Sequence, residues 1–170
     1  IVESFGKNKV FRELMTFLAP YKVTPHKVNL ILQKFHDESV EVIRKRPYML
    51  CAVKGFGFLT VDEIGRQLCQ RLNDPMRISG CLAYIMESAM KEEGHLFLYR
   101  EELVRRSLEL LNDNVYGQQV TETEVQQILY RLVMQGSIVL DEDRVYVARL
   151  YEEETQTEDM ISSRLLDPEQ

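Results

Sequence analysis

The sequence has no tryptophan, and its three cysteines and three histidines are few for 170 residues. The cysteines, Cys51, Cys69 and Cys81, are odd in number and form no CxxC pair, so the sequence predicts neither a disulfide framework nor a zinc site. Each lies in an apolar helical context, which favours reduced core thiols. No apolar run is long enough to span a bilayer and no signal peptide is present, so we expect a cytoplasmic protein without membrane contact.

Motifs for catalysis are also lacking. The sequence has no GxxxxGK[ST] phosphate loop, no HExxH or GxSxG motif, and no paired Cys/His cluster. The histidines, His26, His36 and His95, are scattered, and His95 after Gly94 is most simply a structural histidine. We therefore expect no catalytic residue, no metal and no cofactor in this chain, which should have neither ATPase nor nuclease activity by itself.

Composition is that of a soluble globular protein, with 45% hydrophobic and 28% charged residues. The chain begins with Ile1 rather than Met, so we expect it to be a piece of a longer protein. The net charge of −6 is unevenly distributed: residues 1–109 hold 17 basic and 14 acidic side chains, and residues 110–170 hold 4 and 13. The first part is therefore mildly basic, which suits contact with a nucleic-acid backbone, and the acidity lies in the last third.

The stretch 47–72, PYMLCAVKGFGFLTVDEIGRQLCQRL, organises the chain. A short apolar segment leads into the turn Lys54-Gly55-Phe56-Gly57-Phe58, and a helix follows with apolar residues three or four apart: Val61, Ile64, Leu68 and Leu72. Thr60 to Glu63 has the pattern of a capping box that would start this helix. The two glycines permit positive φ angles and close backbone approach, while Phe56 is expected to fill the cleft between the helices.

This pattern is typical of a helix-hairpin-helix, which grips a nucleic-acid backbone without distinguishing bases. The N–H groups of the turn and of the following helix would point outward together at a phosphate. Lys54 before the turn and Arg66 and Arg71 after it favour this function. Asp62 and Glu63 in the expected first helical turn oppose it, because they would occupy the positive end of the helix dipole. A purely structural αα-hairpin remains the alternative.

An earlier stretch repeats the unit. A helix is predicted over Val10 to Leu18, and Thr24 and Pro25 are good first residues for a second helix, Pro25 to Phe35. Lys22-Val23-Thr24 then aligns with Gly55-Phe56-Gly57, so Val23 is the apolar plug of a first hairpin that lacks both glycines. A linking helix from Glu38 to Arg46 ends in three cations, which are most often a solvated cluster and less often a second backbone contact.

The second half is organised differently after the helix stop Asn73-Asp74-Pro75. Periodicity and caps predict helices over Ile78–Glu93, Arg100–Leu111 and Glu122–Gln135, the last with a capping box from Thr121 to Glu124. A short strand is expected at Leu96–Leu98, and two more at Ser137–Leu140 and Arg144–Leu150 around an acidic turn. This order is that of a winged helix with a small β-hairpin.

Winged helices usually bind the major groove of DNA. Here the expected recognition helix carries Glu122 and Glu124 with Arg131 as its one cation, and the wing tip is Asp141-Glu142-Asp143. Such a surface repels phosphate, so we expect a packing or protein-contact module. The tail 151–170 has the pattern of an amphipathic linker helix.

Several linked motifs resemble those of RecD-like ATP-dependent DNA helicases, also called exodeoxyribonuclease V alpha subunits, in their stand-alone form. They recur in the same order: Arg46 to Leu50, Val53 to Phe58 with Val61 to Ile64, Pro75 to Ile78, and Glu93 to His95. The sequence departs from the family pattern at Lys22 and Thr24, where glycines would be expected, and at Gly65, where alanine is usual.

The resemblance implies a bacterial, cytoplasmic parent of DNA repair and recombination that unwinds duplex DNA 5′ to 3′. Its motor would follow this chain and would use ATP and Mg²⁺. The implied fold is mainly α: a tandem helix-hairpin-helix domain over residues 1–74, a winged-helix-like domain over 75–150, and a linker over 151–170 toward the motor.

The function expected for the chain is non-catalytic, non-specific contact with the backbone of single-stranded or forked DNA, as a monomer joined to its motor. The expected contact residues are Lys54, Gly55, Phe56, Gly57, Phe58, Thr60 and Arg66 in the second hairpin and Lys22, Thr24 and Lys27 in the first. The alternative function is a scaffold that docks the motor or a partner without touching DNA.

Overall fold

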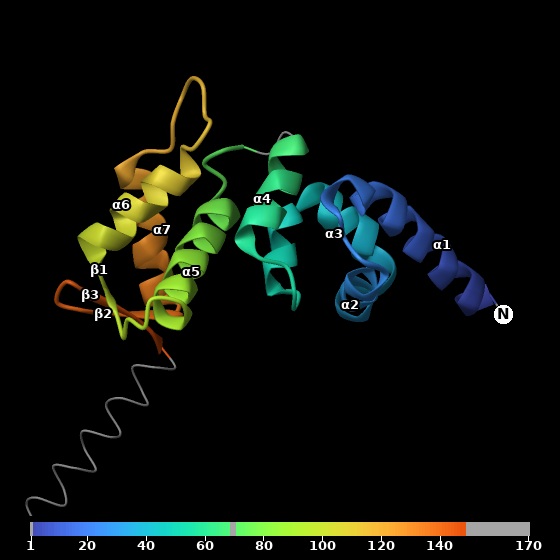
Figure 1. The fold of residues 1–170 in the computed structure, drawn as a ribbon, viewed down its shortest axis with the longest axis horizontal. Helices are drawn as coiled ribbons and strands as arrows, with labels where there is room; N and C mark the ends of the chain where they lie inside the picture. Colours follow the sequence, from blue (N-terminus) through green and yellow to red (C-terminus); the bar gives the residue numbers. More distant parts are fainter. Residues whose placement is uncertain (1, 69–70, 149–170) are drawn as a thin grey trace, which may run out of the picture. The chain divides into compact units, whose positions relative to one another are not determined.

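The computed structural model describes residues 2–68 and 71–148 (Figure 1). Contacts divide the chain into two compact units, Ile1–Gly80 and Cys81–Gln170, with the boundary inside one helix. The expected linker helix over 151–170 and the third cysteine, Cys69, lie outside the described residues. No helix among those residues is both long and apolar enough to cross a bilayer.

The first unit is built from helices alone within its described residues. α1 (Val2–Leu18) passes through the 3₁₀ turn η1 (Ala19–Tyr21) into α2 (Pro25–Phe35), and η2 (His36–Glu38) leads into α3 (Ser39–Lys45). These three α-helices pack on one another (Figure 1). The 3₁₀ helix η3 (Pro47–Ala52) and α4 (Phe58–Gln67) follow, and η3 packs against both α3 and α4. The core consists of residues with no exposed surface: Leu14, Leu18, Val28, Ile31, Ile43, Leu50, Val61 and Ile64.

Helix α5 (Pro75–Lys91) contains the boundary between the units. The second unit continues with β1 (Leu98–Tyr99), α6 (Arg100–Leu111), α7 (Glu122–Met134), β2 (Ile138–Asp141) and β3 (Arg144–Val147). The strands form an antiparallel sheet in the order β1-β3-β2, in which Leu98 pairs with Val145 and Leu140 also pairs with Val145. α6 packs on α7, so the unit combines three helices with a small sheet.

Side-chain capping explains the starts of α2 and α7. The Thr24 hydroxyl accepts a hydrogen bond from the Lys27 amide at 3.3 Å, and Pro25 occupies the first helical position, as predicted. Thr121 and Glu124 form the predicted capping box, and α6 has the predicted bounds. α1 begins well before the predicted Val10. The predicted linking helix, Glu38 to Arg46, is present as α3 with one residue fewer at each end.

The predicted capping box at Thr60 is wrong. Gly57, at φ −83° and ψ 161°, occupies the N-cap, and the Val61 amide donates to the Gly57 carbonyl at 3.2 Å. Thr60 is therefore the third residue inside α4, where helical backbone prevents its side chain from acting as a cap. The helix starts earlier because Phe58 and Val61 are both buried and anchor its first turn in the core.

Candidate nucleic-acid interface

The two turns that the sequence aligns have the same backbone course. Lys22 has φ 57° and Gly55 has φ 92°, so the first residue of each turn is in a left-handed conformation. The third residues also match, with Thr24 at φ −78° and ψ 158° and Gly57 at φ −83° and ψ 161°. The internal repeat predicted from the sequence is therefore present in the backbone, although the first copy has no glycine.

The middle residue of each turn is the apolar plug that was predicted. Val23 is 8% exposed and Phe56 is 6% exposed, so both side chains enter the core of the first unit. The Phe56 amide closes its turn by donating to the Val53 carbonyl at 3.2 Å. With the centre of the turn held inward, the main chain on either side faces outward: Lys54, Gly55 and Gly57 are all exposed.

Lys27 connects the two turns. Its amide is bound by Thr24 of the first hairpin, while its ammonium group lies over the Phe56 ring of the second hairpin, 5.7 Å from the ring centroid. Its Cε lies 3.6 Å from the position that a Cβ would take at Gly55. The structure thus brings a cation from the first hairpin to the glycine turn of the second, which Lys54 precedes in the sequence.

The N-terminus of α4 is open at this turn. Gly57 has no side chain to cap the helix, in contrast to Thr24 at the start of α2. The first turn of a helix holds amide groups without acceptors inside the helix, and the helix dipole adds a partial positive charge there. Leu59 and Thr60 lie in this turn, and Leu59 is 54% exposed. The arrangement suits an anion such as a backbone phosphate.

Other predicted contact residues are less available. The Phe58 side chain is only 3% exposed and stacks on Tyr48 with centroids 6.4 Å apart, so Phe58 can contact a ligand only through its main chain. Arg66 is engaged by Asp62, with Nε 3.1 Å from Oδ2 and its side chain 30% exposed. Lys22 and Thr24 are exposed at the first turn, and Thr60 is half-buried.

Asp62 is the residue whose role sequence reasoning missed. It lies at the fifth position of α4, so it is not at the positive end of the dipole, and the first turn holds no acidic residue. Its carboxylate is buried and accepts hydrogen bonds from Tyr48 at 2.6 Å and from Arg77 Nε at 2.8 Å. Arg77 Nη2 lies 3.2 Å from the second oxygen.

Arg77 is itself buried to 0% exposure, and its Nη1 donates to the Leu72 carbonyl at 2.7 Å. Burial alone would raise the pKa of Asp62, but the hydrogen bonds from Arg77 and Tyr48 outweigh it and hold this pKa below its usual value. Burial and the contact with Asp62 raise the pKa of Tyr48. The charge of Asp62 is therefore compensated inside the protein, while Glu63 is exposed and lies beyond the first turn of α4.

Steric contact with Tyr48 explains why position 65 is a glycine. The Tyr48 ring reaches the backbone of α4 to bind Asp62, and its Cζ would lie 2.6 Å from a Cβ at Gly65. The alanine that is usual in the resembling family would clash here. Gly65 thus belongs to the same buried network as Asp62 and Tyr48. A sequence pattern could have indicated this only by pairing an aspartate with an arginine fifteen residues away.

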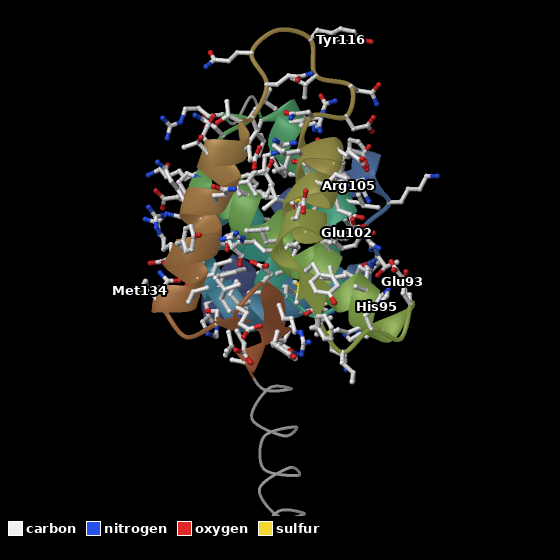
Figure 2. The ribbon with its side chains drawn as sticks, turned by 90° about the vertical axis from the view of Figure 1, so that its left-hand side faces the viewer. Glu93, His95, Glu102, Arg105, Tyr116 and Met134 are labelled. Atoms are coloured by element: carbon white, nitrogen blue, oxygen red, sulfur yellow. The ribbon has the colours of Figure 1, made fainter. Side chains whose placement is uncertain are left out.

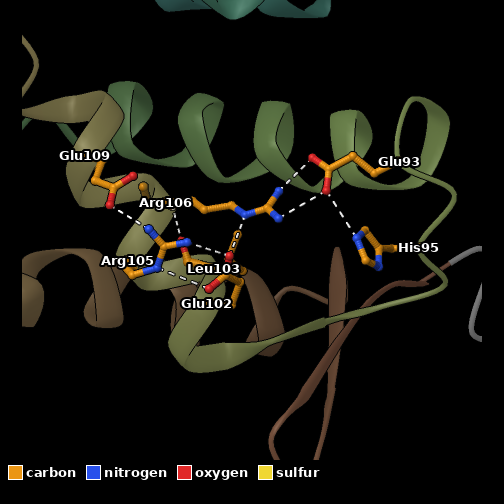
Figure 3. A network of polar contacts seen from close by, with 8 residues as sticks. Glu93, His95, Glu102, Leu103, Arg105, Arg106 and Glu109 are labelled. Carbon is orange, nitrogen blue, oxygen red and sulfur yellow. Dashed lines mark hydrogen bonds and ion pairs between the residues drawn. The ribbon is translucent and has the colours of Figure 1, made fainter.

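The cations of α6 in the second unit are occupied by carboxylates (Figure 3). Arg106 binds both Glu93 and Glu102, each with a closest distance of 2.8 Å, and Arg105 binds Glu102 at 2.7 Å and Glu109 at 2.6 Å. Hydrogen bonds from Arg105 and Arg106 lower the pKa of Glu102 to about 2. These pairs leave the guanidinium groups little capacity for phosphate.

The predicted acidic residues of this unit are exposed as expected. Asp141, Glu142 and Asp143 form the tip of the β2–β3 hairpin, and Arg100 lies 3.6 Å from Asp143. Figure 2 shows Arg105 and Glu102 side by side on α6, with Tyr116 at the tip of the loop that follows it. Tyr116 is 95% exposed and Met134 is 87% exposed. His95 is exposed just after the end of α5 and pairs with Glu93 at 3.1 Å, so it is a helix-end and not a core histidine.

Two turns with a left-handed first residue, a buried plug and a following helix define the first unit as a helix-hairpin-helix structure. The family model described as the ATP-dependent RecD2 DNA helicase HHH domain matches residues 7–97, more than half of the chain. The chain belongs to this family.

A relative of known name extends the comparison. The chain is similar to the ATP-dependent RecD2 DNA helicase of Deinococcus radiodurans, with 27% identity over 100 residues. The aligned part is 59% of this chain and 14% of that helicase. The chain thus spans a small part of this relative, and the resemblance to RecD-like helicases found in the sequence is confirmed.

Proposed function

We propose that this chain is a non-catalytic accessory region of an ATP-dependent 5′–3′ DNA helicase and that its second hairpin contacts the DNA backbone without sequence preference. The observation that carries the proposal is the joint geometry of the glycine turn: an open N-terminus of α4 beside Lys54, with Lys27 placed over Phe56. Backbone amides and cations together bind phosphate irrespective of the base. Membership of a RecD2 helicase family supports DNA as the ligand.

The parent protein is part of the same proposal. Its motor would follow this chain, bind ATP and Mg²⁺, and act in the cytoplasm of a bacterium in DNA repair and recombination, with this region as a monomeric part. The second unit is proposed to be a winged-helix module, because its helices and strands follow that order and its sheet has the order β1-β3-β2. Its paired arginines and acidic hairpin tip favour a protein contact over a DNA contact.

The second candidate function is a scaffold that docks the motor without touching DNA. The acidity of the second unit favours the scaffold function for the second unit. Binding of a fluorescein-labelled forked DNA and of its single-stranded arm to the 170-residue chain, followed by anisotropy over a range of salt concentrations, separates the two functions. DNA contact predicts affinity that falls linearly with the logarithm of salt concentration. Absence of binding at low salt would leave the scaffold as the function.

A further inference from the structure

The first unit has a second basic surface that shares no residue with the two hairpin turns. It is an open groove of about 640 Å³ between α1 and α3, called here the α1–α3 groove, and it is lined by Lys9, Arg12, Glu13, Thr16, Phe17 and Arg44. The five residues from α1 recur at the spacing of one helical face, and α3 packs alongside α1. Three of the six lining side chains are cations and one is an acid.

The cations of this groove are available for a ligand. Among the described residues, no carboxylate lies within ion-pair distance of Lys9, Arg12 or Arg44, whereas the neighbouring Lys45 is bound to Glu41 at 2.6 Å. Lys9, Arg12 and Arg44 are exposed. The groove lies in the mildly basic part of the chain, and this local excess of positive charge favours a polyanion.

The geometry of Arg44 also favours a phosphate ligand. Its guanidinium carbon lies 5.9 Å from the centroid of the Phe17 ring, so an aromatic face supports the planar group. A guanidinium stacked in this way keeps its fork of N–H donors for the two oxygens of a phosphate. The Arg12 Nε donates to the Asn8 carbonyl at 3.3 Å, which orients that side chain along α1.

We infer that the α1–α3 groove is a second binding site for the phosphodiester backbone of nucleic acid, with Arg12, Arg44 and Lys9 as its contacts. The inference rests on the proposed function, because it gives the same DNA a second point of contact in the first unit. The three cations at the end of the predicted linking helix, Arg44-Lys45-Arg46, were most simply explained from the sequence as a solvated cluster. The structure separates them: Arg44 joins the groove, and Lys45 does not line it.

The test is the salt dependence of binding to a single-stranded thymidine oligonucleotide, measured by anisotropy with the 170-residue chain. The double variant Arg12→Gln/Arg44→Gln should lower the slope of log K against log salt concentration by about 1.4, because each lost contact with a single strand contributes about 0.7. The control Lys34→Gln/Arg131→Gln removes the same charge from exposed positions outside both sites and should leave the slope unchanged. Lys9→Gln/Arg12→Gln repeats the test without disturbing the stack on Phe17.

Each outcome decides between the sites. An unchanged slope in both folded groove variants, together with a reduced slope in Lys54→Ala, overturns the groove and leaves the hairpin proposal in place. A reduced slope in both groove variants, together with an unchanged slope in Lys54→Ala, supports the groove and overturns the proposal that the hairpin binds DNA. If polyglutamate of matched charge competes as well as the oligonucleotide does, the ligand is an acidic protein segment and the inference is wrong. Absence of DNA binding by the unaltered chain at low salt overturns both sites.

Discussion

Gly55 and Gly57 differ in what a side chain would do, although they flank the same phenylalanine. Gly55 has φ +92°, a conformation that side chains disfavour, and its missing Cβ would touch Lys27. Gly57 has φ −83°, and a Cβ there would have no atom within 4 Å. The expectation that both glycines serve positive φ angles is therefore wrong for Gly57, where Thr24 shows that a side chain fits the matching position.

Gly57→Val should consequently leave the fold stable and weaken DNA binding, because the new side chain would cover the open N-terminus of α4. Gly55→Val should instead lower stability by about 1 kcal/mol or more, since it imposes a positive φ on a β-branched residue. Thermal unfolding followed by circular dichroism measures the stability of both variants, and anisotropy at one moderate salt concentration measures their affinity for DNA. Unaltered affinity in a folded Gly57→Val variant would show that the turn does not hold phosphate.

Asp62 is the residue on which the buried network depends. Asp62→Asn should destabilise the first unit by about 3–5 kcal/mol, because it leaves the buried Arg77 without its counter-charge. Glu63→Gln, an exposed neighbour on the same helix, is the matched control and should have little effect. Urea unfolding at pH 7, followed by circular dichroism, compares them. Equal stability of the two variants would mean that the network is dispensable.

The same network predicts an acid dependence. The pKa of Asp62 is lower in the folded protein than in the unfolded chain, so its contribution to stability is complete above about pH 4, the unfolded value. That contribution should be lost as the pH falls through the lower folded value. The Asp62→Asn variant has no such group and should lose less stability than the unaltered chain over this acidic range.

At the scale of elements, periodicity and capping patterns were sufficient where both were present. The bounds of α6 follow from apolar spacing, and in α7 apolar spacing and a capping box agree. The start of α4 could not be predicted, because a glycine N-cap has no side-chain pattern. The capping-box pattern from Thr60 to Glu63 also indicated a later start. The link between Asp62 and Arg77 joins two helices through tertiary packing, which no local pattern contains.

The β2–β3 hairpin permits a test of the charge argument for the second unit. Asp141→Lys/Asp143→Lys should leave DNA affinity unchanged or raise it slightly, because the acidic tip is expected to face away from DNA. The exposed contact of Asp143 with Arg100 is long, at 3.6 Å, so its loss should cost little stability. Anisotropy with forked DNA is the measurement. A large loss of affinity would indicate that this hairpin contacts DNA after all.

For the whole molecule, the distribution of charge determines the expected strength and salt dependence of DNA binding. The protein is acidic overall, and the cations proposed to bind DNA are confined to the first unit, at the glycine turn and in the α1–α3 groove. The arginines of α6 are held in ion pairs with carboxylates. Binding should therefore be weak, non-specific and strongly dependent on salt, as the accessory role proposed above requires.

The second hairpin, and not its degenerate first copy, is expected to hold the DNA backbone. The most direct test is the slope of log K against log salt concentration for three proteins: the unaltered chain, Lys54→Ala and Lys22→Ala. Both lysines are exposed, and each lies at a turn of one repeat, so the two variants control for each other. Lys54→Ala should lower the slope by roughly one for every DNA sequence tried, and Lys22→Ala should lower it less. Equal, negligible changes in both folded variants would contradict the claim and leave the hairpins as structural elements.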